Sequence, residues 1–205
     1  ELLQEILPHV AFDGWSDISF RQACSDSGID LSHAQLVCPR GASDLAVFFH
    51  ILGDKKMLER IQDYDFLNQR FRDKVATAVR FRLEAVEDKE AVRRAATLFA
   101  LPQNAVIGAQ LIWTTADAIW TGLGDSSMDV NWYTKRATLS MVYGSCVLFW
   151  LGDDSLDNTA TLDFLDRRIE NVMQFEKVKS NLRENVPLQK LISAPDWLFS
   201  KIKSL

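Results

Sequence analysis

Two long stretches of this 205-residue chain carry no charged side chain, and they constrain its fold more than any other feature. The first covers residues 95–116 but is broken by a turn-like sequence at 101–104, and the second covers residues 137–152. A helix that spans a bilayer needs about 20 consecutive apolar residues, whereas the second stretch has only 16. We therefore expect both stretches to form buried helices at the centre of a helical bundle.

The rest of the chain has the spacing of consecutive helices. Apolar residues recur at helical intervals over 67–86 and over 162–172, which is typical of amphipathic helices. Asp88 and Asn104 can cap the helices that follow them, and Gly152 can end one. No strand-like alternation is visible, so we predict an all-α fold. The expected helices lie at 2–12, 17–25, 32–37, from 45 onward, and at 67–86, 89–100, 105–121, 129–151 and 159–179. We place Arg70, Arg72, Arg80 and Arg82 on the outer face of the 67–86 helix.

Charge and cysteine usage argue against several classes of protein. The net charge of −5 disfavours a basic nucleic-acid binder. Cys24, Cys38 and Cys146 are far apart and odd in number, which favours a reducing interior over a secreted disulfide framework. The three histidines show no metal-ligand spacing, and no nucleophile–base constellation is apparent. We therefore expect no metal, no cofactor and no catalytic residues, so that the chain is not an enzyme.

The N-terminal region has a helix-turn-helix pattern without the charges that DNA binding needs. Two short helices flank a turn at Gly28, as in that motif. Between residues 15 and 45 two arginines stand against four aspartates, and the candidate recognition helix at 32–37 holds no lysine or arginine. Because cations must meet the DNA phosphates, we predict a degenerate unit without specific DNA binding. The layout resembles the TetR-family repressors, and a ligand-responsive repressor is the alternative function.

Residues 129–137 form the most specific stretch of the sequence. Adjacent side chains on a helix point about 100° apart, so we expect one of Trp132 and Tyr133 to pack inward and the other to lie near the surface. Arg136 follows Trp132 by four residues and can stack on it or meet a partner's carboxylate. The stretch is either a well-capped helix with a buried tryptophan or an aromatic–arginine hot spot for a protein partner.

This stretch, together with 101–104 and 164–173, resembles the family of ubiquinone-biosynthesis accessory proteins that is ninth in the coenzyme Q naming series. The resemblance implies a TetR-like fold that has lost DNA binding. It also implies that the chain binds an isoprenoid or quinone lipid and presents a demethoxyubiquinone-type intermediate to a di-iron hydroxylase. The residues that it assigns to the hydroxylase contact are Asp129, Asn131, Trp132, Tyr133 and Arg136.

The two uncharged helices supply candidate lipid-binding residues. A helix that is apolar on every side is either plain core or the wall of a pocket. The sequence leaves both possibilities open, and the resemblance favours a pocket. The candidates are Val106, Ile107, Leu111, Trp113, Trp120, Met141 and Val142.

The last segment, residues 187–205, combines an apolar stripe with a local charge of +2. A basic amphipathic helix suits a membrane surface, although Pro195 would kink it. The alternative is a helix docked on the body or on a second copy of the chain. The expected membrane contacts are Leu188, Leu191, Ile192, Leu198, Phe199, Ile202, Lys201 and Lys203.

These observations divide the chain into three expected parts. They are a degenerate helix-turn-helix subdomain at 1–45, a helical lipid-binding body at 46–186 and an amphipathic segment at 187–205. We expect a homodimer that is cytoplasmic and peripheral on the inner membrane of a bacterium, or on the mitochondrial matrix face in a eukaryote.

Overall fold

The computed structural model describes residues 1–128 and 130–185, apart from the side chains of residue 173 and residues 175–185. Throughout this part the secondary structure is helical, which confirms the predicted all-α class. The α-helices are α1 (Leu2–Asp13), α2 (Asp17–Ser27), α3 (Leu31–Val37), α4 (Ala42–Asp63), α5 (Phe71–Glu84), α6 (Lys89–Ala100), α7 (Ala105–Gly122), α8 (Val130–Leu151) and α9 (Thr159–Asn185). A 3₁₀ turn, Leu156–Asn158, precedes α9.

Two helix boundaries differ from the sequence-based expectation by four or more residues. The helix expected at 67–86 begins only at Phe71. Before it, the Asp65 carboxylate accepts a hydrogen bond from the Leu67 amide at 2.8 Å, and Asn68 adopts a left-handed φ of 66°. This turn cannot continue a right-handed helix. At the other end, α9 runs on to Asn185 instead of ending near residue 179.

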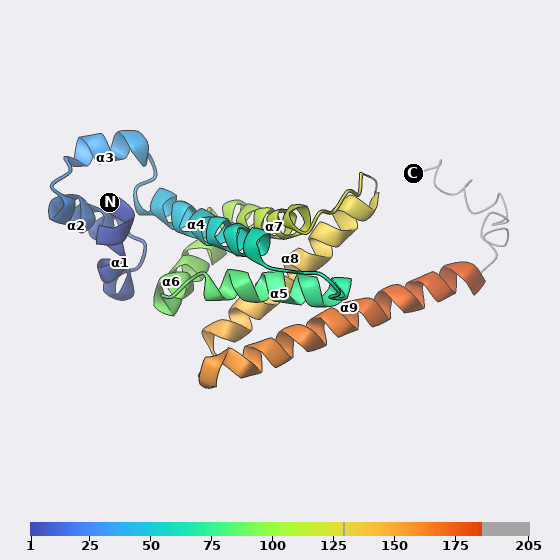
Figure 1. Cartoon of the computed structure of the whole chain (residues 1–205). Helices are drawn as coiled ribbons and strands as arrows, with labels where there is room; N and C mark the ends of the chain where they lie inside the picture. Colours follow the sequence, from blue (N-terminus) through green and yellow to red (C-terminus); the bar gives the residue numbers. More distant parts are fainter. Residues whose placement is uncertain (129, 186–205) are drawn as a thin grey trace, which may run out of the picture. The chain divides into compact units, whose positions relative to one another are not determined.

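The first three helices form a compact unit with strong local signals. Ser16 and Ser19 form a reciprocal capping box at the start of α2, and Gly28 ends that helix with a left-handed φ of 66°. The Asp30 side chain caps α3. Phe20 and Ala23 of α2 belong to a buried cluster that also includes Ala91 of α6. The N-terminal unit therefore shares its core with the body beside it (Figure 1).

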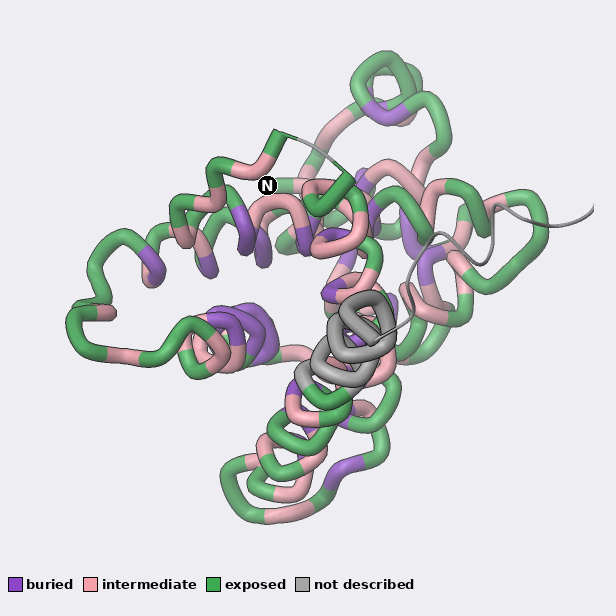
Figure 2. The backbone as a smooth tube through the Cα atoms, turned by 90° about the vertical axis from the view of Figure 1, so that its right-hand side faces the viewer, coloured by how far each residue is buried: buried purple, intermediate pink, exposed green. Residues whose placement is uncertain are grey.

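In the helical body, α7 lies at the centre. This helix packs against α4, α6 and α8, and α4 also packs against α5. The buried residues lie along the inward faces of these helices (Figure 2). Ile119 and Ala116 of α7 are fully buried, as is Met57 of α4. Most of the stability of such a bundle comes from burial of these apolar faces.

The chain divides into two compact units between Asp166 and Arg167. The first unit contains α1–α8 and the beginning of α9, whose third residue, Thr161, donates to Asp153 through its amide at 2.8 Å. The described part of the second unit is the remainder of α9. The expected division at 1–45, 46–186 and 187–205 stays a prediction, and the last of these parts lies outside the described residues.

The described helices differ from typical bilayer-spanning helices in length and apolarity. None of them alone is long and apolar enough to cross a bilayer, whereas α3 and α4, which meet at a bend of 52°, pass the length and composition criteria as a pair.

Candidate functional site

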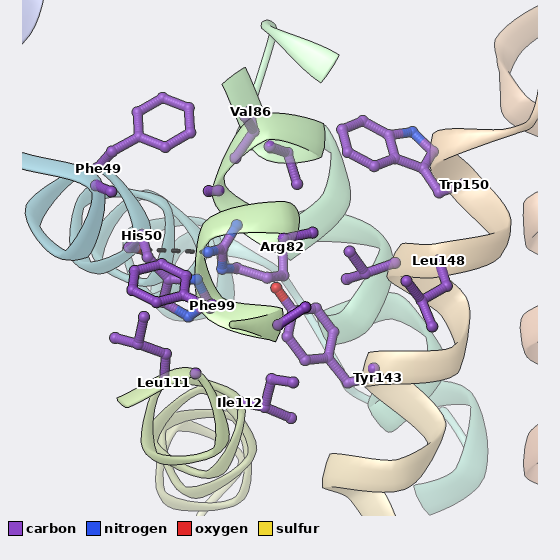
Figure 3. A pocket seen from close by; sticks show the side chains of 18 of the residues that line it. Phe49, His50, Arg82, Val86, Phe99, Leu111, Ile112, Tyr143, Leu148 and Trp150 are labelled. Carbon is purple, nitrogen blue, oxygen red and sulfur yellow. Dashed lines mark hydrogen bonds between the residues drawn. The ribbon is translucent and has the colours of Figure 1, made fainter. Parts of the chain in front are cut away.

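A cavity of about 420 Å³ lies where α4, α5, α6, α7 and α8 meet. Small residues make this space, because alanine and glycine line it at positions where larger side chains would fill it. Gly108 also lets α6 and α7 approach, since a Cβ atom there would lie 2.8 Å from Cβ of Phe99. The larger apolar residues around the cavity include Phe49, Phe99, Ile112, Leu148 and Trp150 (Figure 3).

The polar residues that line the cavity are His50 of α4, Arg82 of α5 and Tyr143 of α8. Asp54 of α4 and Thr115 of α7 hydrogen-bond to them from behind, and we call these five residues the polar floor. The Arg82 guanidinium donates through Nε to Asp54 Oδ1 at 2.5 Å and through Nη2 to the His50 carbonyl at 3.0 Å. The Thr115 hydroxyl lies 2.8 Å from Asp54 Oδ1 and 2.8 Å from His50 Nε2. The Tyr143 hydroxyl is turned toward Arg82 (Figure 3). Five residues from four helices therefore converge at one point.

Burial sets the protonation states of the polar floor. It lowers the pKa of His50 to about 4, and the positive charge of Arg82 acts in the same direction while Asp54 opposes it. His50 is thus neutral near pH 7. Burial also raises the pKa of the Tyr143 phenol, which keeps its proton. With Arg82 and Asp54 paired, the polar floor carries no net charge.

The segment at the start of α8 is built around a buried arginine. The Arg136 side chain is 2% exposed and donates to Asp117 through Nε and to Asp125 through Nη1, the latter at 3.1 Å. Its guanidinium stacks over the Trp132 ring at 4.0 Å, which is one of the two contacts that the spacing allows. Trp132 is half-buried, whereas Tyr133 is 65% exposed and meets the Trp132 ring edge-on. The segment therefore presents Tyr133 outward from a fixed support.

Lys135 completes this arrangement from the other side. Its ammonium group lies 2.7 Å from Asp125 Oδ1 and 2.7 Å from the Ser127 hydroxyl. The hydrogen bond from Lys135, with those from Ser127 and Arg136, lowers the pKa of Asp125 to about 2. Two cations thus hold one carboxylate and fix the loop that leads into α8.

Comparison with known proteins gives matches in sequence and in fold. Residues 105–176 match the COQ9 family model. The chain is 29% identical over 195 residues to a probable mitochondrial ubiquinone biosynthesis protein coq9 of Dictyostelium discoideum, with 91% of this chain and 63% of that protein covered. The mitochondrial ubiquinone biosynthesis protein COQ9 of Rattus norvegicus is 29% identical over 183 residues, which cover 84% of this chain and 57% of that protein. The chain is related to the COQ9 proteins. It spans about three fifths of the length of these relatives.

The fold of this COQ9 relative also matches a solved structure. A TetR transcriptional regulator from Nitrosomonas europaea superimposes with a TM-score of 0.67 at 15% identity, covering 82% of this chain and 94% of that one. The predicted TetR-like fold is confirmed. At 15% sequence identity, this match supports a shared fold and nothing about function.

The COQ9-like region contains most of the predicted site residues, but the cavity uses few of them. Of the seven predicted lipid-binding residues, only Leu111 lines the cavity. Val106 and Met141 are 68% and 69% exposed, and Ile107 is half-buried. Trp120 and Val142 are buried away from the cavity, and Trp113 packs near Trp132. The face of α7 that lines the cavity carries 108, 109, 111 and 112, so six of the seven predicted residues do not contribute to this space.

The sequence-based reading missed the contributions of α4, α5 and α6. Arg82 does not lie on the outer face of α5: it is 4% exposed and points into the polar floor. The sequence contains a sign that Arg82 is buried, because Arg82 lies directly beside Leu83, a member of the apolar series of its helix. His50 directly follows the apolar run that begins its helix, which likewise indicates a buried position.

The other predicted residues are placed as follows. Asn131 is exposed on α8, and Asp129 lies outside the described residues. The predicted membrane contacts between 188 and 203 also lie outside them. Within residues 1–128 and 130–185, no group of three His, Cys, Asp or Glu side chains is arranged to hold a metal ion.

Proposed function

We propose that this chain is an accessory protein of ubiquinone biosynthesis that binds an isoprenoid or quinone lipid in the cavity. The observation that carries the proposal is the apolar cavity of about 420 Å³ inside a TetR-like bundle. Each buried CH₂ group is worth about 0.8 kcal/mol, so an isoprenoid tail resists leaving a bilayer unless an apolar space receives it. The names of the related COQ9 proteins support the pathway.

The same proposal includes a handover to a di-iron hydroxylase that acts on a demethoxyubiquinone-type intermediate. The partner surface would be the start of α8, with Asp129, Asn131, Trp132 and Tyr133. Tyr133 is 65% exposed, and an exposed tyrosine beside a tryptophan is typical of interface hot spots. Arg136 is buried, so its part in this surface is to hold Trp132 in place.

Charge pairing supports the proposal that the chain acts without binding DNA specifically. Arg21 pairs with Asp17 and Arg40 with Asp44, each at 2.6 Å. These are the two arginines of the helix-turn-helix region, and each already has an acidic partner one turn away. The exposed side of α3 shows Leu36 and Val37. A repressor would need free cations at this surface. Protection of a defined promoter at physiological salt, in the presence of competitor DNA, would favour the repressor alternative.

We extend the proposal to location and assembly. The chain would act as a homodimer, peripheral on a membrane through residues 187–205. The related proteins are named as mitochondrial, which fits the matrix face of the inner membrane if the source is a eukaryote; in a bacterium the corresponding place is the cytoplasmic face of the inner membrane.

The experiment that tests lipid binding is mass spectrometry of lipids that copurify with the protein from ubiquinone-producing cells. Ala109 lines the cavity at an exposed position, and its neighbour Gln110 is exposed but does not line it. Ala109→Trp should fill the opening and lower the lipid content at least severalfold, whereas Gln110→Trp should retain it. Equal lipid content in both variants, or no isoprenoid lipid in the unmodified protein, would refute binding in this cavity.

A further inference from the structure

The loop between α4 and α5 is a hydrogen-bonded turn that presents a leucine to the solvent. The amide of Gln69 donates to the Phe66 carbonyl at 3.2 Å, which closes a β-turn with Leu67 and Asn68 at its centre. The left-handed φ of 66° at Asn68 suits the second central position of a type II turn. The Gln69 side chain also donates to the Tyr64 hydroxyl at 3.1 Å. The Leu67 side chain is 76% exposed at this turn.

Aromatic side chains support the turn on both sides. The Tyr64 ring lies 5.3 Å from the ring of Phe81, and Phe71 at the start of α5 stacks on Trp120 of α7 at 5.2 Å. Tyr64 and Phe71 are nevertheless 42% and 48% exposed. We call Tyr64, Leu67 and Phe71 the apolar tip. Holding these side chains in water is unfavourable, and contact with an apolar surface would remove that cost.

The charge of the chain is distributed unevenly between the two ends of α4. Residues 1–45 contain seven acidic residues and two arginines, so they account for the whole net charge of −5. Ala42, at the start of α4, belongs to the buried cluster of the N-terminal unit, whereas Asp63 ends the helix at the loop. The acidic unit and the apolar tip are therefore separated by α4, whose 22 residues span about 33 Å (Figure 1).

Cations accompany the apolar tip. Residues 64–74 hold three cations and two aspartates. Arg70 is exposed at the position before α5, and Lys74 lies one turn into that helix. Between them, Arg72 pairs with Asp73 at 3.3 Å. An apolar apex with aromatic rings around it and cations behind it suits the interface of a bilayer that contains anionic lipids.

We propose that the apolar tip is a membrane contact, which inserts Leu67 into an anionic bilayer and places Tyr64 and Phe71 at the level of the head groups. This inference rests on the proposed peripheral location of the chain and adds a contact that is separate from residues 187–205. A single weak anchor gives only marginal and reversible membrane binding, so a second one matters.

The geometry favours a bilayer over a folded protein as the occupant. Two packed helices, α4 and α5, converge on a turn with one leucine at its apex, so the surface is convex and small. A stable protein interface takes about 800 Å² from each partner, whereas a bilayer accepts a single inserted side chain. Both helices lead away from the tip. The length of α4 is about four Debye lengths at physiological ionic strength, so repulsion between the acidic N-terminal unit and the bilayer is screened.

The first test places an environment-sensitive fluorophore on the full chain. The three native cysteines are buried, so an introduced surface cysteine can be labelled selectively. Leu67→Cys carries the label at the tip, and Leu36→Cys is the matched control, since the two leucines are 76% and 77% exposed. The probe surface is a phosphatidylcholine vesicle with about 30% phosphatidylglycerol. The label at 67 should shift to shorter wavelength and be quenched by a spin-labelled lipid, whereas the label at 36 should stay in water.

The second test measures vesicle partitioning of charged variants. Leu67→Asp should lower the partition coefficient at least threefold even at high salt, where the added charge is screened. Leu36→Asp makes the same change at the acidic end and should leave partitioning unaltered. Arg70→Gln should weaken binding about fivefold at low ionic strength and less at high salt. All three side chains are exposed, so circular dichroism should show an intact fold in each variant.

Each outcome decides the inference. An unshifted label at residue 67 on vesicle-bound protein would overturn it and leave residues 187–205 as the proposed membrane contact. Equal partitioning of Leu67→Asp and Leu36→Asp would overturn it as well. A label at 67 that responds to the hydroxylase and not to vesicles would assign the tip to a protein partner instead. If the full chain does not bind these vesicles at all, the proposed peripheral location fails together with this inference.

Discussion

Replacing Arg136 with methionine should destabilise the fold far more than a surface substitution would. Methionine keeps most of the side-chain length but removes the cation. The Arg136 side chain is 2% exposed and pairs with Asp117 and Asp125, whose side chains are 43% and 4% exposed. In the variant, Asp117 can return to water. Asp125 stays enclosed, with Lys135 and Ser127 as its remaining partners.

The structure sets the expected size of this effect. Removing one partner of a buried ion pair costs about 3–5 kcal/mol. Lys135, at 2.7 Å from Asp125, offsets part of that cost. The lost stacking of Arg136 over Trp132 adds about 0.5–1 kcal/mol. We expect about 3 kcal/mol in total, which lowers the melting temperature by roughly 6–12 °C for a chain of this size.

Urea denaturation followed by circular dichroism measures this difference. Arg21→Met is the control, because its pair with Asp17 joins side chains that are 58% and 68% exposed. An exposed pair at this spacing contributes about 0.3–0.5 kcal/mol. If Arg136→Met loses no more stability than Arg21→Met, the Arg136 cluster does not hold the start of α8 as argued.

Three further predictions address the partner, the cavity and the membrane. Tyr133→Ala should cost at least about 2 kcal/mol of hydroxylase binding in a calorimetric titration and leave the fold intact, since Tyr133 is 65% exposed. Because the pKa of His50 falls from 6.5 to about 4 on folding, its contribution to stability is complete above pH 6.5 and is lost as the pH falls to 4. It amounts to about 3 kcal/mol, and His50→Asn should flatten that part of the urea-denaturation profile. Deleting 187–205 should weaken the flotation of the protein with anionic liposomes. Ile202→Asp should weaken flotation more than Lys203→Ala does, because insertion of an apolar side chain into the membrane does not depend on salt, whereas a lysine near the surface contributes only about 1 kcal/mol.

Local chemistry explains which parts of the fold were predictable from the sequence. Asp88 accepts a hydrogen bond from the Ala91 amide at 2.9 Å, so the cap predicted for the sixth helix is present. The stacking of Arg136 over Trp132 follows from their four-residue spacing within one helix. In each case the interacting groups are close in sequence, so the helical repeat alone brings them together.

The cavity was not predictable in the same way, because it depends on contacts between distant residues. Arg82 and Asp54 are 28 positions apart, and His50 and Thr115 are 65 apart. The sequence shows that α7 is apolar over most of its surface, but it does not show which side faces a space and which faces packed core. The small residues Gly108 and Gly144 line the cavity, whereas the prediction favoured large apolar side chains.

The shared core gives the N-terminal unit a structural task that needs no DNA. Phe49, Ala95 and Phe99 pack against the buried cluster that α1–α3 share with α4 and α6, and they also line the cavity. Trp15 joins the two regions, since its ring lies 5.6 Å from that of Phe49 and its indole N–H donates to the Ala91 carbonyl at 3.0 Å. The cavity wall formed by α4 and α6 is therefore one residue layer thick, with the N-terminal core on its other face. Without that core, the side of α6 that holds the wall in place would face water. This support is a physical reason for a TetR-like fold to keep three helices whose arginines are already paired with aspartates.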